Sequence, residues 1–180
     1  MSIPEQHRSY GPKAIRFASL TVSDSRTEET DGGGATIRRL VEEAGFDYRG
    51  GRIVPDEPAA VLAAFWDLVA SSEADVVVTT GGTGFSPRDV TRSTLEPLWQ
   101  TAIEGFGELF RMLSHRQIGA AAMLSRAAAG VVEGLPVFVL PGSPKAVELA
   151  LSEIILPEIG HLLGQLRRGE RHSEPSGRLR

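Results

Sequence analysis

The chain has 180 residues, enough for one domain with a real hydrophobic core, and its 19 Lys and Arg against 23 Asp and Glu give a net charge of −4. An acidic chain has no long-range attraction to nucleic acid, so we expect no nucleic-acid partner and expect any bound phosphate to be held by local contacts. The absence of cysteine excludes disulfides, thiolate metal sites and a cysteine nucleophile.

The two ends of the chain are polar. Residues 1–12 and 167–180 have almost nothing to bury, so we expect flexible tails around a single folded domain at residues 13–166. The first of these segments has no apolar core of a signal peptide, and no stretch of the chain approaches the roughly 20 apolar residues that a bilayer span needs. We therefore expect a soluble, cytoplasmic protein without membrane contact.

Strand patterns alternate with helix patterns in the first half of the expected domain. Residues 14–23 (AIRFASLTVS) predict a first strand. Residues 34–45 predict a helix, because apolar side chains recur there at helical spacing and a glycine follows. Residues 47–54 predict a weaker strand, and residues 57–72 predict a second helix with Pro58 in its first turn.

The strand that comes next, ADVVVTT at residues 74–80, is continuously apolar and β-branched. This pattern indicates a central strand covered on both faces, because a half-exposed strand would alternate with polar residues. The remaining predicted elements are two helices, a pair of strands joined by the turn EGLP, and a closing helix: residues 91–100, 104–119, 127–132, 137–141 and 145–166.

This order of elements predicts an α/β fold. Strands separated by helices pair in parallel through right-handed crossovers, which gives a three-layer α/β/α sandwich around a mostly parallel central sheet. In such sheets ligands bind beyond the carboxyl ends of the strands. Loops rich in Gly, Ser, Thr, Asp or Pro follow predicted strands at that edge, and we expect them to surround one cleft: residues 23–34, 54–58, 81–91 and 141–145.

The loop GGTGFSPRDVT follows the predicted central strand. Gly81, Gly82 and Gly84 allow the backbone to turn sharply and to direct its N–H groups at an oxyanion such as phosphate. A tight strand-to-helix turn explains these glycines equally well. The motif is neither a Walker loop, because no Lys-Ser/Thr follows, nor a dinucleotide fingerprint, because the glycine spacing differs.

Two aspartates, Asp56 and Asp89, each lie a short distance past a predicted strand. Taken singly, an aspartate in such a place more often forms a turn or caps a helix. Taken together, two carboxylates facing a phosphate loop are suited to hold Mg²⁺, which bridges to substrate phosphates and offsets their charge. Asp56 and Asp89 are therefore the candidate metal ligands.

The segment SDS offers polar groups at the end of the first predicted strand. Ser23 and Ser25 can donate hydroxyl hydrogen bonds to a ligand, and Asp24 can accept from a ribose or a base. An ordinary Ser/Asp turn is an equally good explanation of these residues. Asp31, farther along the same loop, is expected to N-cap the helix that follows.

Two further segments offer sites for an anion. In PGSPK, Gly142 and Ser143 open the last helix, whose N–H groups and dipole favour negative charge, and Lys145 either adds charge or lies in solvent. In LSRAAAG, Ser125 and Arg126 stand among small apolar residues. Arginine there is suited to bidentate recognition of phosphate or carboxylate.

Segments along most of the chain resemble the molybdenum cofactor biosynthesis proteins of the MoaB/MogA family, the molybdopterin adenylyltransferases. They occur in the family's order, from about Arg16 to about Leu163: LTVSDS, VPDE, TTGGTGFSPRDVT, EGFGELFRMLS, LSRAAAG and LPGSPKA. The helix GFGELFRMLS is most similar to the MoaB branch. The resemblance implies the molybdopterin-binding fold, a homotrimer or a homohexamer, and Mg²⁺-dependent transfer of AMP from ATP to the terminal phosphate of molybdopterin, with release of pyrophosphate.

The resemblance also implies roles for individual residues. Asp56 and Asp89 match the family's two essential aspartates, which makes them the expected catalytic residues. The nucleotide side of the pocket is matched by Ser23, Asp24, Gly81, Gly82, Thr83 and Gly84. The side that binds the pterin phosphate is matched by Ser125, Arg126, Pro141, Gly142, Ser143 and Lys145. At residues 31–34 the chain reads DGGG where the family commonly has D-x-S-G, so a serine hydroxyl is missing near the ligand loop.

Two alternatives to an adenylyltransferase remain open at this point. A non-catalytic oligomer that binds molybdopterin or its adenylylated form and passes it on, for instance to the molybdate-insertion enzyme of the same pathway, would have a similar sequence. Pyridine-nucleotide hydrolases related to competence proteins share the scaffold, but they carry an extra domain that this sequence lacks. The presence of both Asp56 and Asp89 favours an active enzyme.

Overall fold

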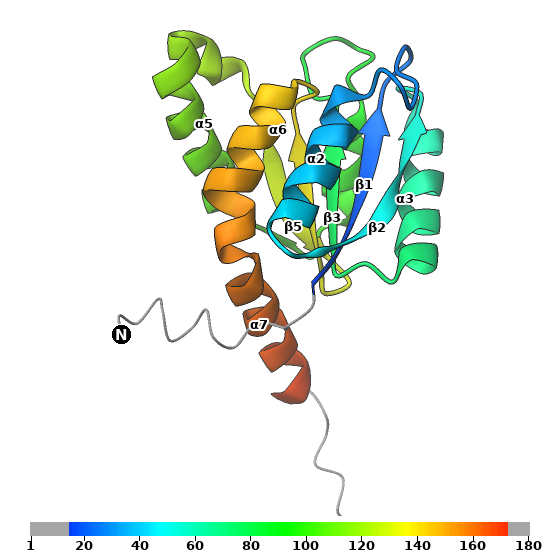
Figure 1. The fold of residues 1–180 in the computed structure, drawn as a ribbon, viewed down its shortest axis with the longest axis vertical. Coiled ribbons are helices and arrows are strands. Elements are labelled where there is room, and N and C mark those ends of the chain that lie inside the picture. Colours follow the sequence, from blue (N-terminus) through cyan, green and yellow to red (C-terminus); the bar gives the residue numbers. More distant parts are fainter. Residues whose placement is uncertain (1–14, 173–180) are drawn as a thin grey trace, which may run out of the picture.

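A six-stranded, mostly parallel sheet forms the centre of the protein, seen here as a computed structural model that describes residues 15–172 (Figure 1). The strands are β1 (Arg16–Val22), β2 (Asp47–Val54), β3 (Val76–Thr80), β4 (Thr101–Ala102), β5 (Ala128–Val132) and β6 (Leu135–Leu140). Their order is β2-β1-β3-β6-β5-β4. The pairs β1–β2, β1–β3 and β3–β6 are parallel, whereas β5 pairs antiparallel with β6 and with β4.

Helices cover both faces of this sheet, so the predicted three-layer α/β/α fold is confirmed. The α-helices are α2 (Gly32–Glu43), α3 (Pro58–Ser72), α4 (Thr91–Leu95), α5 (Glu104–Ile118), α6 (Pro144–Ala150) and α7 (Leu156–His172). Helices α2, α5, α6 and α7 pack on one face, and α3 and α4 pack on the other. None of the helices in the described part of the chain has the length and apolar character needed to cross a membrane.

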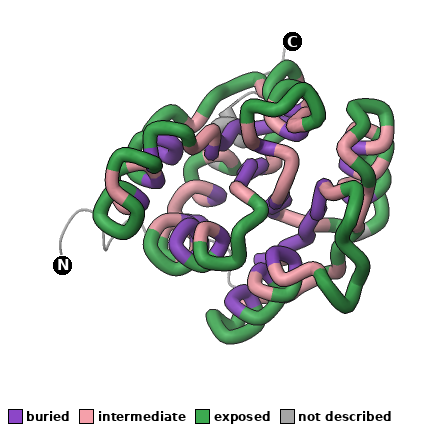
Figure 2. Tube along the Cα trace, turned by 90° about the horizontal axis from the view of Figure 1, so that it is seen from above, coloured by how far each residue is buried: buried purple, intermediate pink, exposed green. Residues whose placement is uncertain are grey.

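The strand β3 shows why the sheet lies at the centre. Val76 and Val78 belong to the hydrophobic core on the α2 side, and Val77 belongs to the core on the α3 side. All three side chains are fully buried. Viewed from above, the buried residues lie inside the molecule and the exposed residues lie around its outside (Figure 2). The prediction of a central strand covered on both faces is confirmed.

The structure differs from the predicted elements between β3 and β5. The helix predicted at residues 91–100 is shorter, because α4 ends at Leu95 and a 3-10 turn, η1 (Glu96–Leu98), follows. Pro97 contributes to the change, because it has no N–H to donate to the carbonyl of Ser93 four residues earlier. The two-residue strand β4 was not predicted. Residues 119–124 form a second 3-10 segment, η2 (Gly119–Leu124).

The sequence pattern predicts one continuous closing helix. In the structure this helix is interrupted by a π-helical turn, η3 (Leu151–Ile155), between α6 and α7. The N–H of Leu156 donates to the carbonyl of Leu151, five residues earlier. Pro157 comes next, and a wider turn suits its missing N–H and bulky ring. Helix α7 then continues to His172, past the predicted boundary at residue 166.

The predicted start of the carboxyl-terminal tail at residue 167 is wrong, because residues 167–172 are helical. Arg167 has a partner that favours this extension: its guanidinium bonds Asp75, just before β3, at 2.7 Å. Residues 1–12 and 173–180, which make up the rest of the predicted tails, lie outside the described residues.

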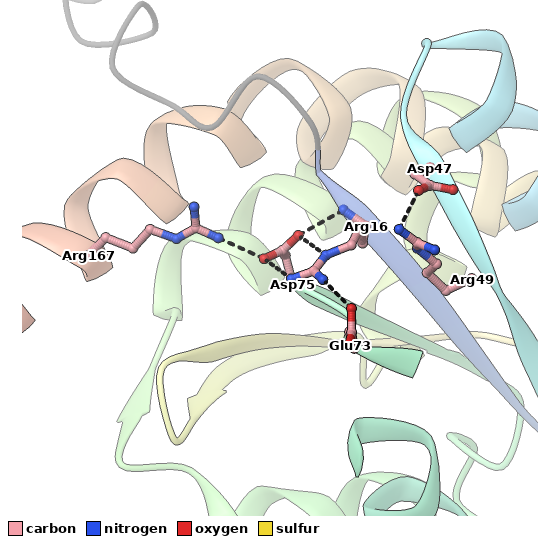
Figure 3. A network of polar contacts seen from close by, with 6 residues as sticks. All are labelled: Arg16, Asp47, Arg49, Glu73, Asp75 and Arg167. Atoms are coloured by element: carbon pink, nitrogen blue, oxygen red, sulfur yellow. Dashed lines mark hydrogen bonds and ion pairs between the residues drawn. The ribbon is translucent and has the colours of Figure 1, made fainter. Parts of the chain in front are cut away.

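Asp75 is the centre of an ion-pair network at the amino ends of the strands (Figure 3). Its carboxylate accepts hydrogen bonds from the backbone N–H and the Nε of Arg16, each at 3.0 Å, and from Arg167. Glu73 also pairs with Arg16. The side chain of Asp75 is only 8% exposed. The network therefore joins β1, the start of β3 and the end of α7.

Removal of the Asp75 charge is expected to destabilise the fold. Burial raises the pKa of Asp75, but the hydrogen bonds and charges of Arg16 and Arg167 outweigh this effect, so the pKa lies below its ordinary value. We expect Asp75→Asn to lower the free energy of unfolding by about 2–3 kcal/mol at pH 7. Because the carboxyl pKa is lowered by folding, this contribution is present above the unfolded-state pKa of about 4 and is lost as pH falls through the lower folded-state value.

Urea denaturation of wild type and variant at pH 7 and at acidic pH measures both effects. The matched control is Asp67→Asn, because Asp67 pairs with Arg52 at 3.3 Å but its side chain is 62% exposed. Exposed pairs contribute at most about 1 kcal/mol, so this control is expected to stay near wild type. Equal losses in the two variants would contradict a special role for the Asp75 network.

Candidate functional site

The topology brings the predicted loops together at one edge of the sheet. The chain leaves β1 through α2 on one face to reach β2, and it leaves β2 through α3 on the other face to reach β3 on the opposite side of β1. The loops after β1 and β3 consequently diverge, which is where α/β sheets bind ligands. Both loops lie at the upper end of the sheet in Figure 1, and α7 extends from the other end.

A cleft of about 670 Å³ lies at this edge, lined by residues from the loops after β1, β2, β3 and β6 and from the segment before β5. The predicted convergence of four loops on one cleft is thus confirmed. The predicted site residues in its lining are Ser23, Asp56, Gly81, Gly82, Thr83, Gly84, Asp89, Ser125, Arg126, Pro141, Gly142 and Ser143.

Two predicted site residues do not line the cleft. Lys145 lies in a separate surface hollow beside Gln117 and Glu148. Asp24 lies next to the cleft, but its carboxylate accepts hydrogen bonds from the backbone of Asp56 and from Arg88. The hydrogen bond from Arg88, followed by the one from the Asp56 N–H, lowers the pKa of Asp24.

The glycine loop after β3 is held from below by Thr91, which is fully buried. The Thr91 hydroxyl donates to the carbonyl of Gly81 at 2.8 Å, and the Thr91 N–H donates to the carbonyl of Gly82 at 2.9 Å. The N–H of Gly81 donates to the carbonyl of Leu140 at 3.1 Å. These bonds fix the loop between β3 and β6. The carbonyls of Gly81 and Gly82 thus have their hydrogen-bond partners within the protein.

The next N–H groups of the loop are available to a ligand. Within residues 15–172, the backbone N–H groups of Gly82, Thr83 and Gly84 have no protein acceptor at hydrogen-bonding distance. All three residues line the cleft. Successive N–H groups without internal partners form a concavity that suits an anion. The loop therefore has the backbone chemistry that the glycine pattern predicts.

The two candidate metal ligands lie against this loop. A Cβ atom on Gly82 would be 2.7 Å from Oδ1 of Asp56, and a Cβ atom on Gly84 would be 2.8 Å from Oδ2 of Asp89. Any side chain at either position would meet a carboxylate. Glycine at positions 82 and 84 therefore allows the carboxylates of Asp56 and Asp89 to lie against the loop backbone, and it also allows a ligand to approach that backbone closely.

Asp89 also has the local role that sequence reasoning gave as the alternative. Its Oδ2 accepts a hydrogen bond from the N–H of Ser86 at 2.8 Å, and its own N–H donates to the carbonyl of Ser86. The carboxylate therefore closes a turn in the loop. Because Asp89 also lines the cleft, its contact with Ser86 fixes the carboxylate at the edge of the glycine loop.

The surroundings of Asp56 disfavour its negative charge, and a bound cation would offset this effect. Burial between the loops raises its pKa, and the negative charges of Asp24 and Asp89 raise it further, against the lowering effect of the hydrogen bond from the Asp24 N–H. Among residues 15–172, no group of three or more His, Cys, Asp or Glu side chains is arranged to hold a metal ion. Asp56 and Asp89 form a pair of oxygen donors, which suits Mg²⁺ because Mg²⁺ commonly takes one or two carboxylates and completes its shell with phosphate and water.

Arg126, from the segment before β5, also lines the cleft. Its guanidinium donates to the carbonyl of Gly84 at 2.6 Å and lies over the exposed ring of Phe85, 5.6 Å from the ring centre. Arg126 therefore supports the glycine loop from the β5 side. Below it, the hydroxyl of Thr80 donates to the carbonyl of Pro141 at 2.9 Å, which ties the ends of β3 and β6 together.

Sequence reasoning missed several polar residues of the cleft, among them Thr21 and Thr80. The Thr21 hydroxyl donates to Asp31 at 2.6 Å, and the other Asp31 oxygen accepts from the N–H of Gly34, so the predicted N-cap is confirmed. A Cβ atom on Gly33, where the family commonly has serine, would lie 3.0 Å from the Thr80 side chain. The available signal was a threonine at the carboxyl end of a strand that is otherwise buried.

Comparisons with known proteins agree with this fold. The family described as "Probable molybdopterin binding domain" matches residues 18–161 of the chain. "Molybdenum cofactor biosynthesis protein B" of Bacillus cereus is 44% identical over 169 residues, which are 93% of this chain and 99% of that protein.

Solved structures show the same similarity. A crystal structure of "Molybdenum cofactor biosynthesis protein B" superimposes with a TM-score of 0.83 at 44% identity, covering 87% of this chain and 98% of the other. The tungsten cofactor synthesizing protein MoaB from Pyrococcus furiosus superimposes with a TM-score of 0.79 at 40% identity, covering 87% and 99%.

Proposed function

Because the chain belongs to the molybdopterin-binding domain family and is similar throughout to molybdenum cofactor biosynthesis proteins B, we propose that it transfers AMP from ATP to the terminal phosphate of molybdopterin. Pyrophosphate is the other product, and Mg²⁺ is required. The observation that carries this proposal is the cleft itself, in which N–H groups of the glycine loop that have no acceptor within residues 15–172 lie beside Asp56 and Asp89.

The glycine loop and the two aspartates form the proposed triphosphate site. The N–H groups of Gly82, Thr83 and Gly84 donate to phosphate oxygens, and their fixed direction favours the charge that develops during transfer. Asp56 and Asp89 hold Mg²⁺, which when bound supplies positive charge that offsets the triphosphate and the leaving pyrophosphate. Ser23 also lines the cleft.

The segment before β5 and the loop after β6 form the proposed site for the pterin phosphate. Ser125, Arg126, Gly142 and Ser143 line it, and Arg126 supplies a positive charge. An oxygen of the terminal phosphate attacks the α-phosphorus of ATP, and the bond from that phosphorus to the bridging oxygen of pyrophosphate breaks. The attacking oxygen is already ionised at neutral pH. The chain therefore needs to position two substrates and stabilise charge, without a protein nucleophile or a strong base.

Self-association stays a prediction that the surface of α5 and η2 supports. Leu109, Met112, Ile118 and Met123 expose large apolar side chains there, between 47% and 77% exposed. Phe106 and Phe110 on the same helix are buried in the core, so α5 has one face in the domain and another free to meet a second copy. We expect a homotrimer or a homohexamer, which sedimentation analysis of the purified chain distinguishes.

Pyrophosphate release tests the proposed activity. The purified protein is incubated with Mg-ATP and molybdopterin, pyrophosphate is quantified, and the pterin product is weighed by mass spectrometry. We expect release that depends on molybdopterin and stops with EDTA, together with a pterin heavier by one adenylyl group. Tight molybdopterin binding without release would overturn the enzyme and identify the non-catalytic carrier, which hands its ligand to a molybdate-insertion enzyme.

A further inference from the structure

Asp24 connects the two loops that carry Asp56 and Asp89. Its own backbone N–H donates to Oδ2 of Asp56 at 3.1 Å, and the N–H of Asp56 donates to Oδ1 of Asp24 at 3.0 Å. The pair is reciprocal, with each residue using one backbone and one side-chain group. It fastens the loop after β1 to the loop after β2 just beyond a backbone bond from Ser23 to Val54 of 2.8 Å.

The second oxygen of Asp24 reaches the loop after β3. Oδ2 accepts from Nε of Arg88 at 3.2 Å and from Nη2 of the same guanidinium. Arg88 immediately precedes Asp89. The carboxylate of Asp24 therefore bonds one candidate metal ligand, Asp56, and Arg88, the residue next to the other candidate. These two partners are 32 and 64 residues away from Asp24 in the sequence.

This arrangement determines which way Asp56 faces. One carboxylate oxygen, Oδ2, is held by the N–H of Asp24. The other, Oδ1, is the atom that a Cβ on Gly82 would meet at 2.7 Å, so it faces Gly82, which lines the cleft. A substitution of the Asp24 side chain leaves this N–H donor in place but removes the acceptor of the Asp56 N–H, so the backbone that carries the Asp56 carboxylate loses this bond to the loop after β1.

We propose that Asp24 is a positioning residue: it acts through Asp56 and Arg88 to hold the two carboxylates at a fixed separation across the glycine loop. This role replaces the direct contact with the ribose or base that the sequence suggested for Asp24. It rests on the proposed function for its effect on catalysis. Its effect on the loops can be measured without any substrate.

Exposure of the pair makes the proposal testable in folded protein. The side chains of Arg88 and Asp24 are 59% and 46% exposed. Exposed ion pairs contribute little to global stability, so variants at these positions are expected to fold. A misplacement of about 1 Å at a reacting centre nevertheless costs about 100-fold in rate. A positioning role therefore predicts a large loss of rate with an unchanged unfolding midpoint.

The kinetic test uses Asp24→Ala, Arg88→Gln and the double variant, with Glu28→Ala as an acidic control on the same loop. We expect Asp24→Ala to lower kcat about 30- to 100-fold with a smaller change in KM for Mg-ATP. Arg88→Gln lowers kcat less, Arg88→Lys restores part of the loss, and the double variant is no worse than Asp24→Ala, because Arg88 acts through Asp24. A raised KM with unchanged kcat, or fully additive losses, would overturn the proposal in favour of direct nucleotide binding.

Hydrogen exchange separates this proposal from the proposed function. The backbone N–H of Asp56 is protected by Asp24, so peptides that cover residues 54–58 exchange faster in Asp24→Ala than in wild type, without ATP or pterin. If wild type releases no pyrophosphate, the function fails while faster exchange still supports the positioning role. Unchanged exchange in Asp24→Ala, and in Asp24→Asn as a milder variant, sinks the positioning role whatever the activity.

Discussion

Asp56→Asn is expected to lower the rate of pyrophosphate release at least about 100-fold while leaving the free energy of unfolding within about 1 kcal/mol of wild type. Asparagine has the same shape as aspartate, and its oxygen can still accept the hydrogen bond from the Asp24 N–H. It loses the charge that holds Mg²⁺. Because the charges of Asp24 and Asp89 oppose ionisation of Asp56, removal of that charge does not weaken the fold.

Steady-state pyrophosphate release across a Mg²⁺ titration, paired with urea denaturation, measures both quantities. The control is Asp67→Asn, which removes one negative charge from the exposed surface of α3, outside the cleft, and is expected to retain the wild-type rate. Asp56→Asn at the wild-type rate and the wild-type Mg²⁺ requirement would rule Asp56 out as a metal ligand.

Gly81→Ala is expected to have the largest effect on stability, a loss of about 3 kcal/mol or more in the free energy of unfolding. Gly81 has φ +89°, a backbone region that costs other residues about 1–2 kcal/mol. In addition, a Cβ atom would lie 2.3 Å from the carbonyl oxygen of Val22, a backbone atom of β1 that cannot turn aside. The loop must then move, so the rate of pyrophosphate release is expected to fall as well.

Two other glycines separate the sources of this loss. Gly45 has φ +78°, but no atom of the described residues 15–172 lies within 4 Å of a Cβ atom there, so Gly45→Ala is expected to cost only the strained backbone conformation, about 1–2 kcal/mol. Gly105 in α5 has neither constraint, and Gly105→Ala is expected to stabilise by about 0.5–1 kcal/mol through helix propensity. Urea denaturation of the three variants gives the comparison. A Gly81→Ala loss no larger than that of Gly45→Ala would mean that the contact with Val22 is unimportant.

The layers of the fold could be predicted because strong local patterns agree with the tertiary packing. The continuously apolar sequence at Val76, Val77 and Val78 predicted the central strand, whose side chains are buried, and the alternation with helices predicted its parallel neighbours. The cleft followed from the same reasoning, since loops at the carboxyl ends of parallel strands meet at one edge. Glycines and aspartates there could be identified by residue type and by their place after a strand.

What could not be predicted depends on contacts between distant segments. The partners of Asp24 lie on loops that sequence spacing does not connect, so the sequence left only a turn and a contact with a ribose or base as alternatives for SDS. Thr91 reads as the first residue of a helix, and only the fold shows its hydroxyl beneath Gly81. The strand β4 has two residues, too few for a periodic pattern. Lys145 follows the loop after β6, but helix geometry carries its side chain to another surface.

The bonds from Thr91 to the glycine loop have a consequence for how a ligand would be received. The carbonyls of Gly81 and Gly82 accept hydrogen bonds from Thr91, and the N–H of Gly81 donates to Leu140, so groups of the protein itself hold these atoms in place. Ordering of this segment therefore belongs to folding and not to association, so little conformational entropy is lost on binding. The loop is accordingly expected to have the same backbone conformation with and without ligand. In this it would differ from nucleotide sites whose loops close over the bound ligand.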